Sequence, residues 1–462
     1  MQLTIPLSKK AGPLFQEVYR GLREGILSGT LREGQKLPST RDLAEQLGIS
    51  RTVALLAYDQ LLAEGFAAGR EGSGTYVRSG VRLGRPASPE YSAKVRLTKF
   101  GDLAAAAWTR MDFPVRATRS LPYDFAYGRS DLETFPFEKW RRILLRLARR
   151  ASVSEFDYGP AAGKTALRDA ICNHLQRSRA VVSDPSQVIV VNGSQQALDL
   201  IARVLLAPGE PVAIEDPSYQ GTTEILRAAG ARLLPLAVDR EGIDPGEIPS
   251  SARIVFVTPS HQYPTGAILP LARRLALLDW AKRRNAVIVE DDYDGEFRYE
   301  GQPLESLQGL DREGRVIYIG TFSRTIFSAL RIGYLVVPKG LVTAFTAAKW
   351  LCDRHTATLE QATLAEFIAS GMYERYLRKV RRENAKRRGA LLDAIRSHLG
   401  DGAEVTGDGA GGSHCAMAAT ASERRGCDRG GGSARSSRLR DLSVLPEEAE
   451  ADGHCGWLFE NE

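Results

Sequence analysis

Residues 37–77 read LPSTRDLAEQLGISRTVALLAYDQLLAEGFAAGREGSGTYV. Gly48 divides the first part of this stretch into two segments, and each begins with a hydroxyl side chain, Ser39 or Ser50. Such a hydroxyl accepts a hydrogen bond from a free backbone N–H at a helix start, so both segments are predicted to be helices, the second ending at Gly65. The side chains expected on the inner face of the second helix are Val53, Leu56, Ala57 and Leu61. The stretch therefore predicts two short helices joined by a tight glycine turn.

The residues on either side of these helices complete a small domain. Apolar residues recur at helical spacing from Leu14 to Leu27, which predicts a further helix that ends at Ser28-Gly29. After the two short helices, Arg70 to Val77 places a glycine-bearing turn beside β-prone residues, as in a two-stranded hairpin. Three helices followed by a hairpin are typical of a winged helix-turn-helix.

The order of these features is that of a known DNA-binding family. The helix caps, the turn glycine, the Ala57-Tyr58 pair and the glycine-rich hairpin of residues 37–77 resemble the winged helix-turn-helix of the GntR family. The resemblance implies a domain over residues 1–78 that binds double-stranded DNA. The sequence departs from its relatives at Thr52-Val53-Ala54, where they often carry a polar residue followed by Thr-Val, and this could change the preferred DNA sequence.

The resemblance and the chemistry of helix ends indicate which residues would touch DNA. A recognition helix starting at Ser50 presents Ser50, Arg51 and Thr52 where backbone amides and a guanidinium can meet phosphates and base edges. We expect Arg51 to read a base. The residues expected to contact the DNA backbone are Ser39, Arg41 and the hairpin turn of Gly72, Ser73, Gly74 and Thr75. Taken alone, Arg41 or Arg51 could equally be a solvated surface arginine with no role in DNA binding.

Length and composition limit the number of domains and the class of protein. Its 462 residues, 43% hydrophobic and 26% charged, are enough for two or three domains. No run approaches the roughly 18 apolar residues of a membrane span, and the start MQLTIPLSKK lacks a signal-peptide core, so we expect a cytoplasmic protein. The five cysteines lie at irregular spacings, which argues against a disulfide framework. The net charge of +6 is compatible with a polyanionic partner but decides nothing alone.

Two further segments follow the predicted DNA-binding domain. Residues 79–121 contain several prolines and little periodicity, so we interpret them as a mostly extended linker, either a solvated tether or a basic segment along DNA phosphates. From 122 to 407, short apolar runs alternate with helical stretches, which predicts an α/β domain with a mainly parallel sheet. The strand candidates are residues 188–191, 211–214, 254–257, 287–289 and 316–319.

Polar residues follow several of these strand candidates. Ser194 and Gln195 come after the first strand and open an apolar helix, so their amides can cradle a phosphate at the positive helix end, although a Gly-Ser pair is often only a cap. The loop 215–219, Glu-Asp-Pro-Ser-Tyr, follows the second strand, and the loop 258–266 follows the third. The remaining candidates follow the last two strands: Asp291, Tyr293, Ser323, Arg324 and Arg331.

Together these motifs, over residues 122–345, resemble a fold type I aminotransferase, and joined to a GntR head they resemble the MocR subfamily of regulators. The resemblance implies pyridoxal 5′-phosphate (PLP) as the cofactor. Tyr219 would stack on its ring, Asp291 would face the pyridine nitrogen, and Tyr293 would reach the phenolic oxygen. Ser323 and Arg331 are suited to hold the phosphate. Ordinary packing of a tyrosine, or an acidic loop at the end of a strand, is the alternative for each residue by itself.

The chain departs from the family at one decisive position. Where relatives carry the Schiff-base lysine, this sequence has Arg324, and no lysine occurs between Lys282 and Lys339. A guanidinium stays protonated and is a poor nucleophile, so covalent attachment should fail and no catalytic residue is assigned. The resemblance implies a homodimeric regulator that senses an amino-acid-like effector. The alternatives are an aminotransferase with an accessory DNA-binding head and a decayed, non-functional regulator.

Residues 408–462 do not continue the pattern of the family. They are rich in Gly, Ala, Ser and Arg and lack strand or helix periodicity, so we expect a disordered, low-complexity tail. One hypothesis is a reading frame displaced near residues 408–412, which would leave the small C-terminal subdomain incomplete. The other is a natural disordered tail. The histidines and cysteines of this tail match no compact zinc-ligand spacing, so no metal site is expected.

Overall fold

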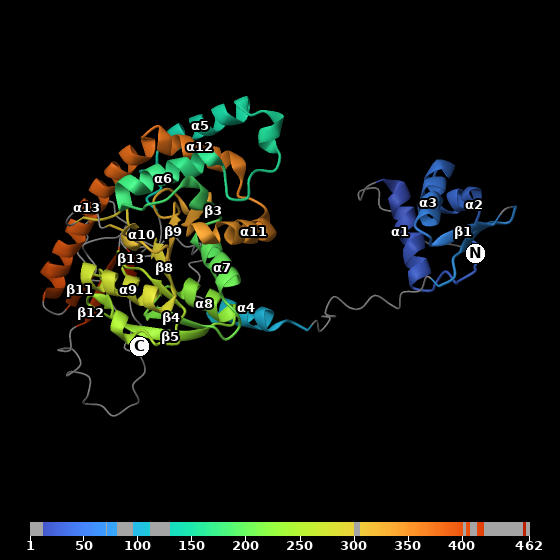
Figure 1. Ribbon diagram of the computed structural model, residues 1–462. Helices are drawn as coiled ribbons and strands as arrows, with labels where there is room; N and C mark the ends of the chain where they lie inside the picture. The colour runs from blue at the N-terminus through green and yellow to red at the C-terminus, as the bar shows by residue number, and fades with distance from the viewer. Residues whose placement is uncertain are drawn as a thin grey trace. The chain divides into compact units, whose positions relative to one another are not determined.

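The chain forms two compact units in a computed structural model, residues 1–96 and residues 97–462 (Figure 1). The structure describes residues 13–70, 72–80, 96–110, 130–299, 305–400, 403–406, 414–419 and 456–458. Each unit is considered by itself.

The first unit consists of three helices and a hairpin. Its elements are α1 (Leu14–Leu27), α2 (Thr40–Leu47), α3 (Arg51–Ala63), β1 (Ala67–Arg70) and β2 (Gly74–Val77). The two strands pair antiparallel, and the backbone N–H of Leu37 also bonds the carbonyl of Thr75 at 2.9 Å. The predicted winged helix-turn-helix is therefore the observed arrangement.

The three helices of the first unit share one core. Val18, Leu22, Leu43 and Leu61 from the three helices are completely or almost completely buried together. Gly48 ends α2 in the left-handed conformation (φ 63°), which glycine adopts without a Cβ penalty. The prediction for Leu56 was wrong, because it is 45% exposed while Ala54 and Tyr58 are buried in its place. Helical periodicity located the face of α3 but misplaced its centre by about a quarter of a turn.

The second unit is built on an eight-stranded sheet. The strands lie in the order β3-β10-β9-β8-β7-β4-β5-β6, and the neighbouring pairs from β9 to β5 are parallel. β10 is antiparallel to both its neighbours, so β3 runs in the same direction as β9. The strand bounds are β3 (Val188–Val191), β4 (Pro211–Asp216), β5 (Arg232–Asp239), β6 (Gly242–Ile243), β7 (Ile254–Val257), β8 (Val287–Asp292), β9 (Val316–Thr321) and β10 (Gly333–Val336).

Helices cover both faces of this sheet (Figure 1). Alternate side chains of one strand enter different layers: Val188 and Val190 pack with α5, α6, α12 and α13, whereas Ile189 and Val191 pack with α7, α8 and α11. The helix bounds are α4 (Lys99–Arg110), α5 (Phe137–Arg150), α6 (Thr165–Arg179), α7 (Ser194–Leu205), α8 (Gln220–Ala228), α9 (Leu271–Arg284), α10 (Leu307–Leu310), α11 (Val342–Asp353), α12 (Thr358–Ala369) and α13 (Met372–Leu399). The predicted mainly parallel α/β domain is confirmed.

Two sequence interpretations need correction. The segment 79–121 is not extended throughout, because Lys99–Arg110 form α4, which packs on α8. Residues 81–95 and 111–121 of that segment lie outside the described residues. The tail is not free of strands, because β12 (His414–Ala419) pairs with β11 (Ala403–Thr406) and β13 (Gly456–Leu458). These runs are uncharged apart from one glutamate, so they can pair in a sheet. Their strand signal is weak in the sequence because Gly and Arg residues flank them.

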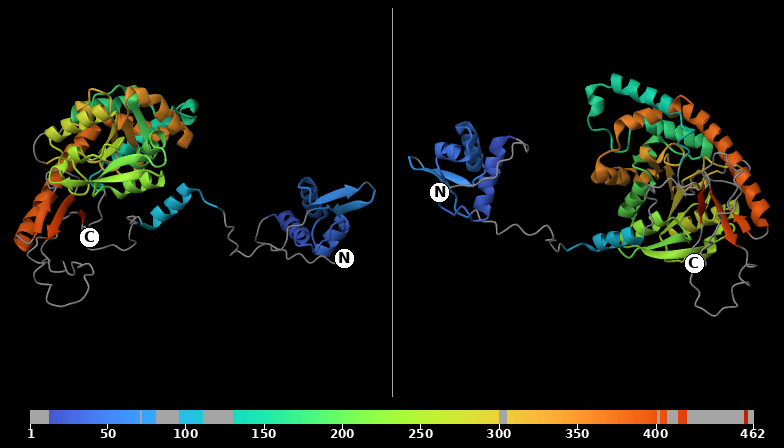
Figure 2. Two further views of the ribbon diagram at one scale, coloured as in Figure 1. Left: turned by 60° about the horizontal axis from the view of Figure 1, so that its bottom comes forward. Right: turned by 180° about the vertical axis from the view of Figure 1, so that it is seen from behind.

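The long helix α13 runs along one side of the second unit and leads directly to the small sheet of β11, β12 and β13 (Figure 2). Within the described residues, no helix is long and apolar enough to cross a membrane.

Candidate functional site

The candidate cofactor residues lie at one edge of the sheet. β3, β4, β7, β8 and β9 run in the same direction, so the loops at their carboxyl ends meet at that edge. In open α/β sheets, ligands bind outside the carboxyl ends of the strands. The fold therefore brings the residues predicted from five separate motifs to one place.

The start of α7 and the side chain of Arg331 form one wall of this place. Gly193 caps α7 with φ 80°, and a Cβ at this position would lie 2.7 Å from Nη2 of Arg331. The same Nη2 donates to the carbonyl of Asn192 at 3.0 Å. The guanidinium thus lies against the turn that precedes Ser194, where the first helical amides have no partner within the helix. A guanidinium beside a helix N-terminus suits a phosphate.

Ser323 adds a hydroxyl that is available to a ligand. Its Oγ is buried and has no hydrogen-bond partner among the described residues. Its backbone carbonyl, in contrast, accepts from Oγ of Ser130 at 2.8 Å, which fixes the loop after β9. A buried hydroxyl without a partner costs free energy unless something else binds it.

The carboxyl of Asp291 is the uncommitted acid of the motif Glu290-Asp291-Asp292. Glu290 accepts from the amides of Leu307 and Gln308 at 2.9 and 2.8 Å. Asp292 accepts from Arg179 at 2.6 Å and is buried with it. Asp291 points to the opposite side of the strand, and its Oδ1 is buried without a partner in the described part of the chain.

Burial raises the pKa of Asp291 to about 7, and the charges of Asp292 and Asp294 add to this effect, while Arg324 opposes it. A carboxyl in such surroundings is stabilised in its charged form by a cation at the free oxygen. A protonated pyridine nitrogen would supply that cation.

Three tyrosines line the neighbouring wall. The ring of Tyr219, at the start of α8, lies edge-on to Tyr263 at 5.8 Å, and Tyr263 lies edge-on to Tyr293 at 5.9 Å between centroids. The hydroxyl of Tyr293 lies 3.1 Å from Nδ1 of His261, which is 2.8 Å from a carboxylate oxygen of Asp294. The aromatic rings can contact a flat ligand, and the buried His261–Asp294 pair orients Tyr293.

Arg324 lies in the same place as these groups. Its side chain is half-buried, and its guanidinium carbon is 5.6 Å from the centre of the Tyr293 ring. Lys349 is the fully buried lysine of the described chain, but it is bound to Asp353 at 2.5 Å and lies on α11. It is therefore committed to an ion pair of its own.

Asp353 belongs to a supporting network that the sequence analysis missed. Its Oδ2 accepts from Nδ2 of Asn192 at 2.6 Å and from Nε2 of Gln196 at 2.8 Å, so it holds the turn on both sides of Ser194. No local motif signals such a contact, because α11 is more than 140 residues away in the sequence.

The candidate DNA residues lie on the surface of the first unit. The hydroxyls of Ser39 and Ser50 accept from the backbone amides of Asp42 and Val53 at 3.1 and 3.3 Å, so both serve as helix caps. Arg41 and Arg51 are exposed, and neither makes a hydrogen bond or ion pair with another described residue through its side chain. Thr52 is exposed beside Arg51 in the first turn of α3. The two guanidiniums are thus available to phosphates or bases.

Two basic residues that were not among the predicted contacts lie beside Tyr76 of the hairpin: Arg70 on β1, and Lys36 from the segment before α2. Gly72 and Gly74 have positive φ values of 68° and 114°, as the tight turn requires, and Ser73 Oγ lies 2.6 Å from the Tyr76 hydroxyl. The exposed side chains of Arg70 and Lys36 lie 4.5 and 6.0 Å from the Tyr76 ring. Strand periodicity does not identify such exposed cations. They add positive charge beside the hairpin turn.

Comparison with known families gives two matches. Residues 14–77 match "Bacterial regulatory proteins, gntR family", and residues 124–411 match "Aminotransferase class I and II".

Relatives of similar length share both parts. A protein described as "Probable rhizopine catabolism regulatory protein MocR" from Rhizobium meliloti is 40% identical over 410 residues, 86% of this chain and 80% of the relative. The transcriptional regulator TauR from Rhodobacter capsulatus is 36% identical over 86% of this chain and 82% of its own. The pyridoxine biosynthesis regulator PdxR from Corynebacterium glutamicum is 31% identical over 81% and 77% of the two chains.

Solved structures resemble the second unit. The kynurenine aminotransferase of Pyrococcus horikoshii, solved in complex with PMP, is 29% identical with a TM-score of 0.59 and covers 70% of this chain and 80% of that chain. LysN, the α-aminoadipate aminotransferase of Thermus thermophilus, is 32% identical with a TM-score of 0.58 and covers 62% and 74%.

Proposed function

Because this chain belongs to the GntR family of bacterial regulators, in the MocR-like branch that carries an aminotransferase class I and II domain, we propose that it is a transcription regulator controlled through a PLP-type site that lacks a covalent anchor. The first unit binds duplex DNA in the cytoplasm. The second unit senses a small amino-acid-like effector.

The residues at the sheet edge fit the cofactor. The free carboxyl oxygen of Asp291 suits a protonated ring nitrogen, and the hydroxyl of Ser323 with the guanidinium of Arg331 suits the phosphate. The amides of Ser194 and Gln195 and the ring of Tyr219 would complete the contacts, and the hydroxyl of Tyr293 would meet the phenolic oxygen. When bound, PLP supplies an aldehyde on an electron-withdrawing ring.

The observation that carries this proposal is Arg324 beside Tyr293 in the pocket. A guanidinium cannot lose its proton at ordinary pH, so it provides neither a covalent tether nor a proton carrier. Transamination needs an amine for both roles. We therefore propose that the domain binds its ligands without turning them over.

Recognition of DNA is proposed to centre on α3. The exposed Arg51 and Thr52 at its start would enter the major groove, with Arg51 reading a base. Ser39, Arg41 and the turn of residues 72–75 would hold the phosphates. A homodimer would place two such heads on repeated half-sites, and an effector that favours one arrangement would change occupancy.

Borohydride trapping tests the absence of a covalent anchor. The full chain and its Arg324→Lys variant are incubated with PLP, reduced, freed of unbound ligand and examined by absorbance and mass. We expect a retained pyridoxyl group only in the lysine variant. Retention in both proteins would contradict the proposal and would favour the aminotransferase reading.

A further inference from the structure

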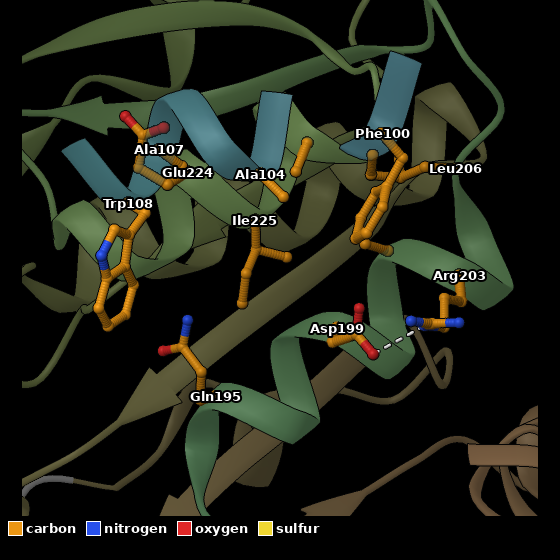
Figure 3. A pocket seen from close by; sticks show the side chains of 13 residues that line it. Phe100, Ala104, Ala107, Trp108, Gln195, Asp199, Arg203, Leu206, Glu224 and Ile225 are labelled. Atoms are coloured by element: carbon orange, nitrogen blue, oxygen red, sulfur yellow. Dashed lines mark hydrogen bonds and ion pairs between the residues drawn. The ribbon is translucent and has the colours of Figure 1, made fainter. Parts of the chain in front are cut away.

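A hollow of about 480 Å³ lies beneath α4, outside the residues assigned to DNA or to the cofactor apart from Gln195 (Figure 3). Its walls come from α4, α7 and α8. Small-molecule sites in proteins are commonly about 300–1,000 Å³ in volume. The hollow is therefore large enough for a compact organic ligand.

The sequence of α4 creates this shape. Phe100, Ala104 and Trp108 recur at helical spacing, so an aromatic ring stands at each end of one helix face with an alanine between them. Figure 3 shows Phe100 and Trp108 extending from opposite ends of α4, with Ala104 between them. They are 51% and 68% exposed, although each presents a large apolar surface.

The opposite walls are also made of small or apolar side chains. These are Ala202 of α7, Ile225 and Ala228 of α8, and the residues directly after the two helices, Leu206 and Ala229. Polar contacts fix the α4 wall to the α8 wall. Arg110 at the end of α4 donates to the buried carboxylate of Glu224 at 2.6 Å, and Gln220 donates to the carbonyl of Arg110 at 3.0 Å. The hollow is thus formed before any ligand arrives.

The charges around the hollow are already neutralised. Asp199 accepts from Arg203 at 2.7 Å, and Glu224 accepts from both Arg110 and Arg227. The side chain of Gln195 makes no hydrogen bond with any described residue, and it lies at the same end of the hollow as Trp108 (Figure 3). A charged ligand would find no unpaired partner here, whereas a single hydroxyl, carbonyl or amide could bond the Gln195 amide.

We propose that this hollow is a second ligand site, specific for an uncharged aromatic compound that carries one hydrogen-bonding group. The ring lies between Phe100 and Trp108 against the alanines, and the polar group bonds Gln195. This inference does not rest on the proposed function, because it needs neither DNA nor PLP.

The position of the site suggests what it does for the protein. Gln195 is the second residue of α7, and α8 begins directly after Tyr219, so a ligand in the hollow touches both helices that lead from the candidate cofactor residues. Any effect of a ligand in the hollow on affinity at the cofactor residues would be reciprocal.

Binding of 4-(trifluoromethyl)benzyl alcohol to the full chain, followed by the ¹⁹F signal of this probe, tests the site. Ala104→Phe fills the hollow with a ring, whereas Ala105→Phe places the same ring on the exposed side of the same helix. We expect saturable binding to the unaltered chain and to Ala105→Phe, and affinity about tenfold or more weaker in Ala104→Phe. Absence of saturable binding to the unaltered chain, or full retention in Ala104→Phe, overturns the proposal.

Trp108→Ala is a second variant that removes a wall instead of filling the space. Trp108 is 68% exposed, and we expect about two- to tenfold weaker probe binding for this variant, with its thermal unfolding measured alongside as the check on the fold. Should Ala104→Phe change the oligomeric state while the probe binds neither protein, the hollow is a contact between copies and the proposal fails.

Discussion

The guanidinium carbon of Arg324 lies 5.6 Å from the ring centre of Tyr293. A permanent cation therefore occupies the pocket that also contains the uncommitted carboxyl of Asp291, and it counteracts in part the rise that burial causes in the pKa of that carboxyl. In this position an amine would react with an aldehyde, whereas a guanidinium interacts with a ligand only through its charge and its hydrogen bonds. Binding in the pocket should therefore depend on charge and shape alone.

We predict that the pocket hardly distinguishes an aldehyde from an alcohol. Pyridoxine 5′-phosphate should bind within about threefold of PLP, because neither ligand can form a bond to Arg324. In the Arg324→Lys variant, the affinity for PLP should exceed the affinity for the alcohol by about tenfold or more, because the new amine can react with the aldehyde. Quenching of protein fluorescence gives both dissociation constants. A strong preference for the aldehyde in the unaltered chain would show that another amine reacts.

Arg331→Ala should weaken binding of PLP by about 10- to 100-fold, since a charge-assisted hydrogen bond to the phosphate is lost. The affinity of Arg331→Lys for PLP should lie between that of the unaltered chain and that of Arg331→Ala, because lysine keeps the charge but not the two parallel N–H donors of the guanidinium. Both variants share the left-handed backbone of this residue (φ 51°), so strain cannot explain a difference between them. Removing the exposed Arg312 serves as the charge control. Equal affinities for all four proteins would exclude Arg331 from the site.

Asp291→Asn should stabilise the ligand-free protein at pH 8 while weakening its affinity for PLP. Burial raises the pKa of Asp291 from its ordinary 3.8 to about 7, so ionising this carboxyl costs stability, and the cost grows as pH rises from about 3.8 to 7. The gain in Tm of the variant should therefore shrink as pH falls from 8 towards 4. Thermal unfolding over this range, with and without PLP, measures both effects. A variant less stable than the parent at pH 8 would refute the assignment.

A stability prediction concerns His174, which is buried between α6 and α13. Burial opposes its charge, but Glu374 at 2.8 Å and Glu296 at 3.6 Å outweigh this and raise the pKa of His174 to about 9. The pairs stabilise the fold fully below pH 6.5, and this stabilisation is lost as pH rises through about 9.

His174→Gln should therefore lower Tm more at pH 6 than at pH 10. His398→Gln, an exposed histidine on α13, should leave Tm unchanged at both values. If the loss caused by His174→Gln were the same at pH 6 and pH 10, His174 would not carry the charge that we assign to it.

Much of the fold could be predicted from the sequence because its signals are local. Ser39 and Ser50 mark helix starts that the structure reproduces, and fully buried apolar runs such as Ile254–Val257 predict interior parallel strands directly. β5 and β10 were missed. Arg232–Asp239 lies near the edge of the sheet and is only partly buried, and Gly333–Val336 is short and begins with a glycine, which weakens a strand signal. The helix α4 was missed because alanines give little amphipathic signal.

The candidate cofactor site was predictable as a set of residue types but not as a network. The motifs indicated Asp291 and Ser323, and the structure adds that each has a buried polar atom without a described partner. The family resemblance selected Asp291, but the sequence could not indicate the partners that occupy Glu290 and Asp292, which are the start of α10 and Arg179. Contacts between distant elements decide such questions, and periodicity carries no information about them.

The contribution of Arg51 to DNA recognition can be separated from that of Arg41. Replacing Arg51 by Ala should cost about 1–3 kcal/mol on the best duplex and relax preference at one base pair, because a base-reading contact is lost. Replacing Arg41 should weaken binding to all duplexes by the same factor, as expected for a phosphate contact. It should also reduce the slope of log affinity against log salt concentration by about one. Fluorescence anisotropy with a panel of single base-pair changes measures both. Identical profiles for the two variants would contradict these roles.

Binding of the full chain to duplex DNA from the region upstream of its own gene tests the central claim most directly. Titrations between 50 and 200 mM salt are compared with a shuffled duplex of the same composition, and with the Arg51→Ala variant on both. We predict a preference of about a thousandfold for the specific duplex, an affinity that falls steeply with salt, and a much smaller preference in the variant. Equal, salt-insensitive binding to both duplexes would contradict the assignment of this chain as a DNA-binding regulator.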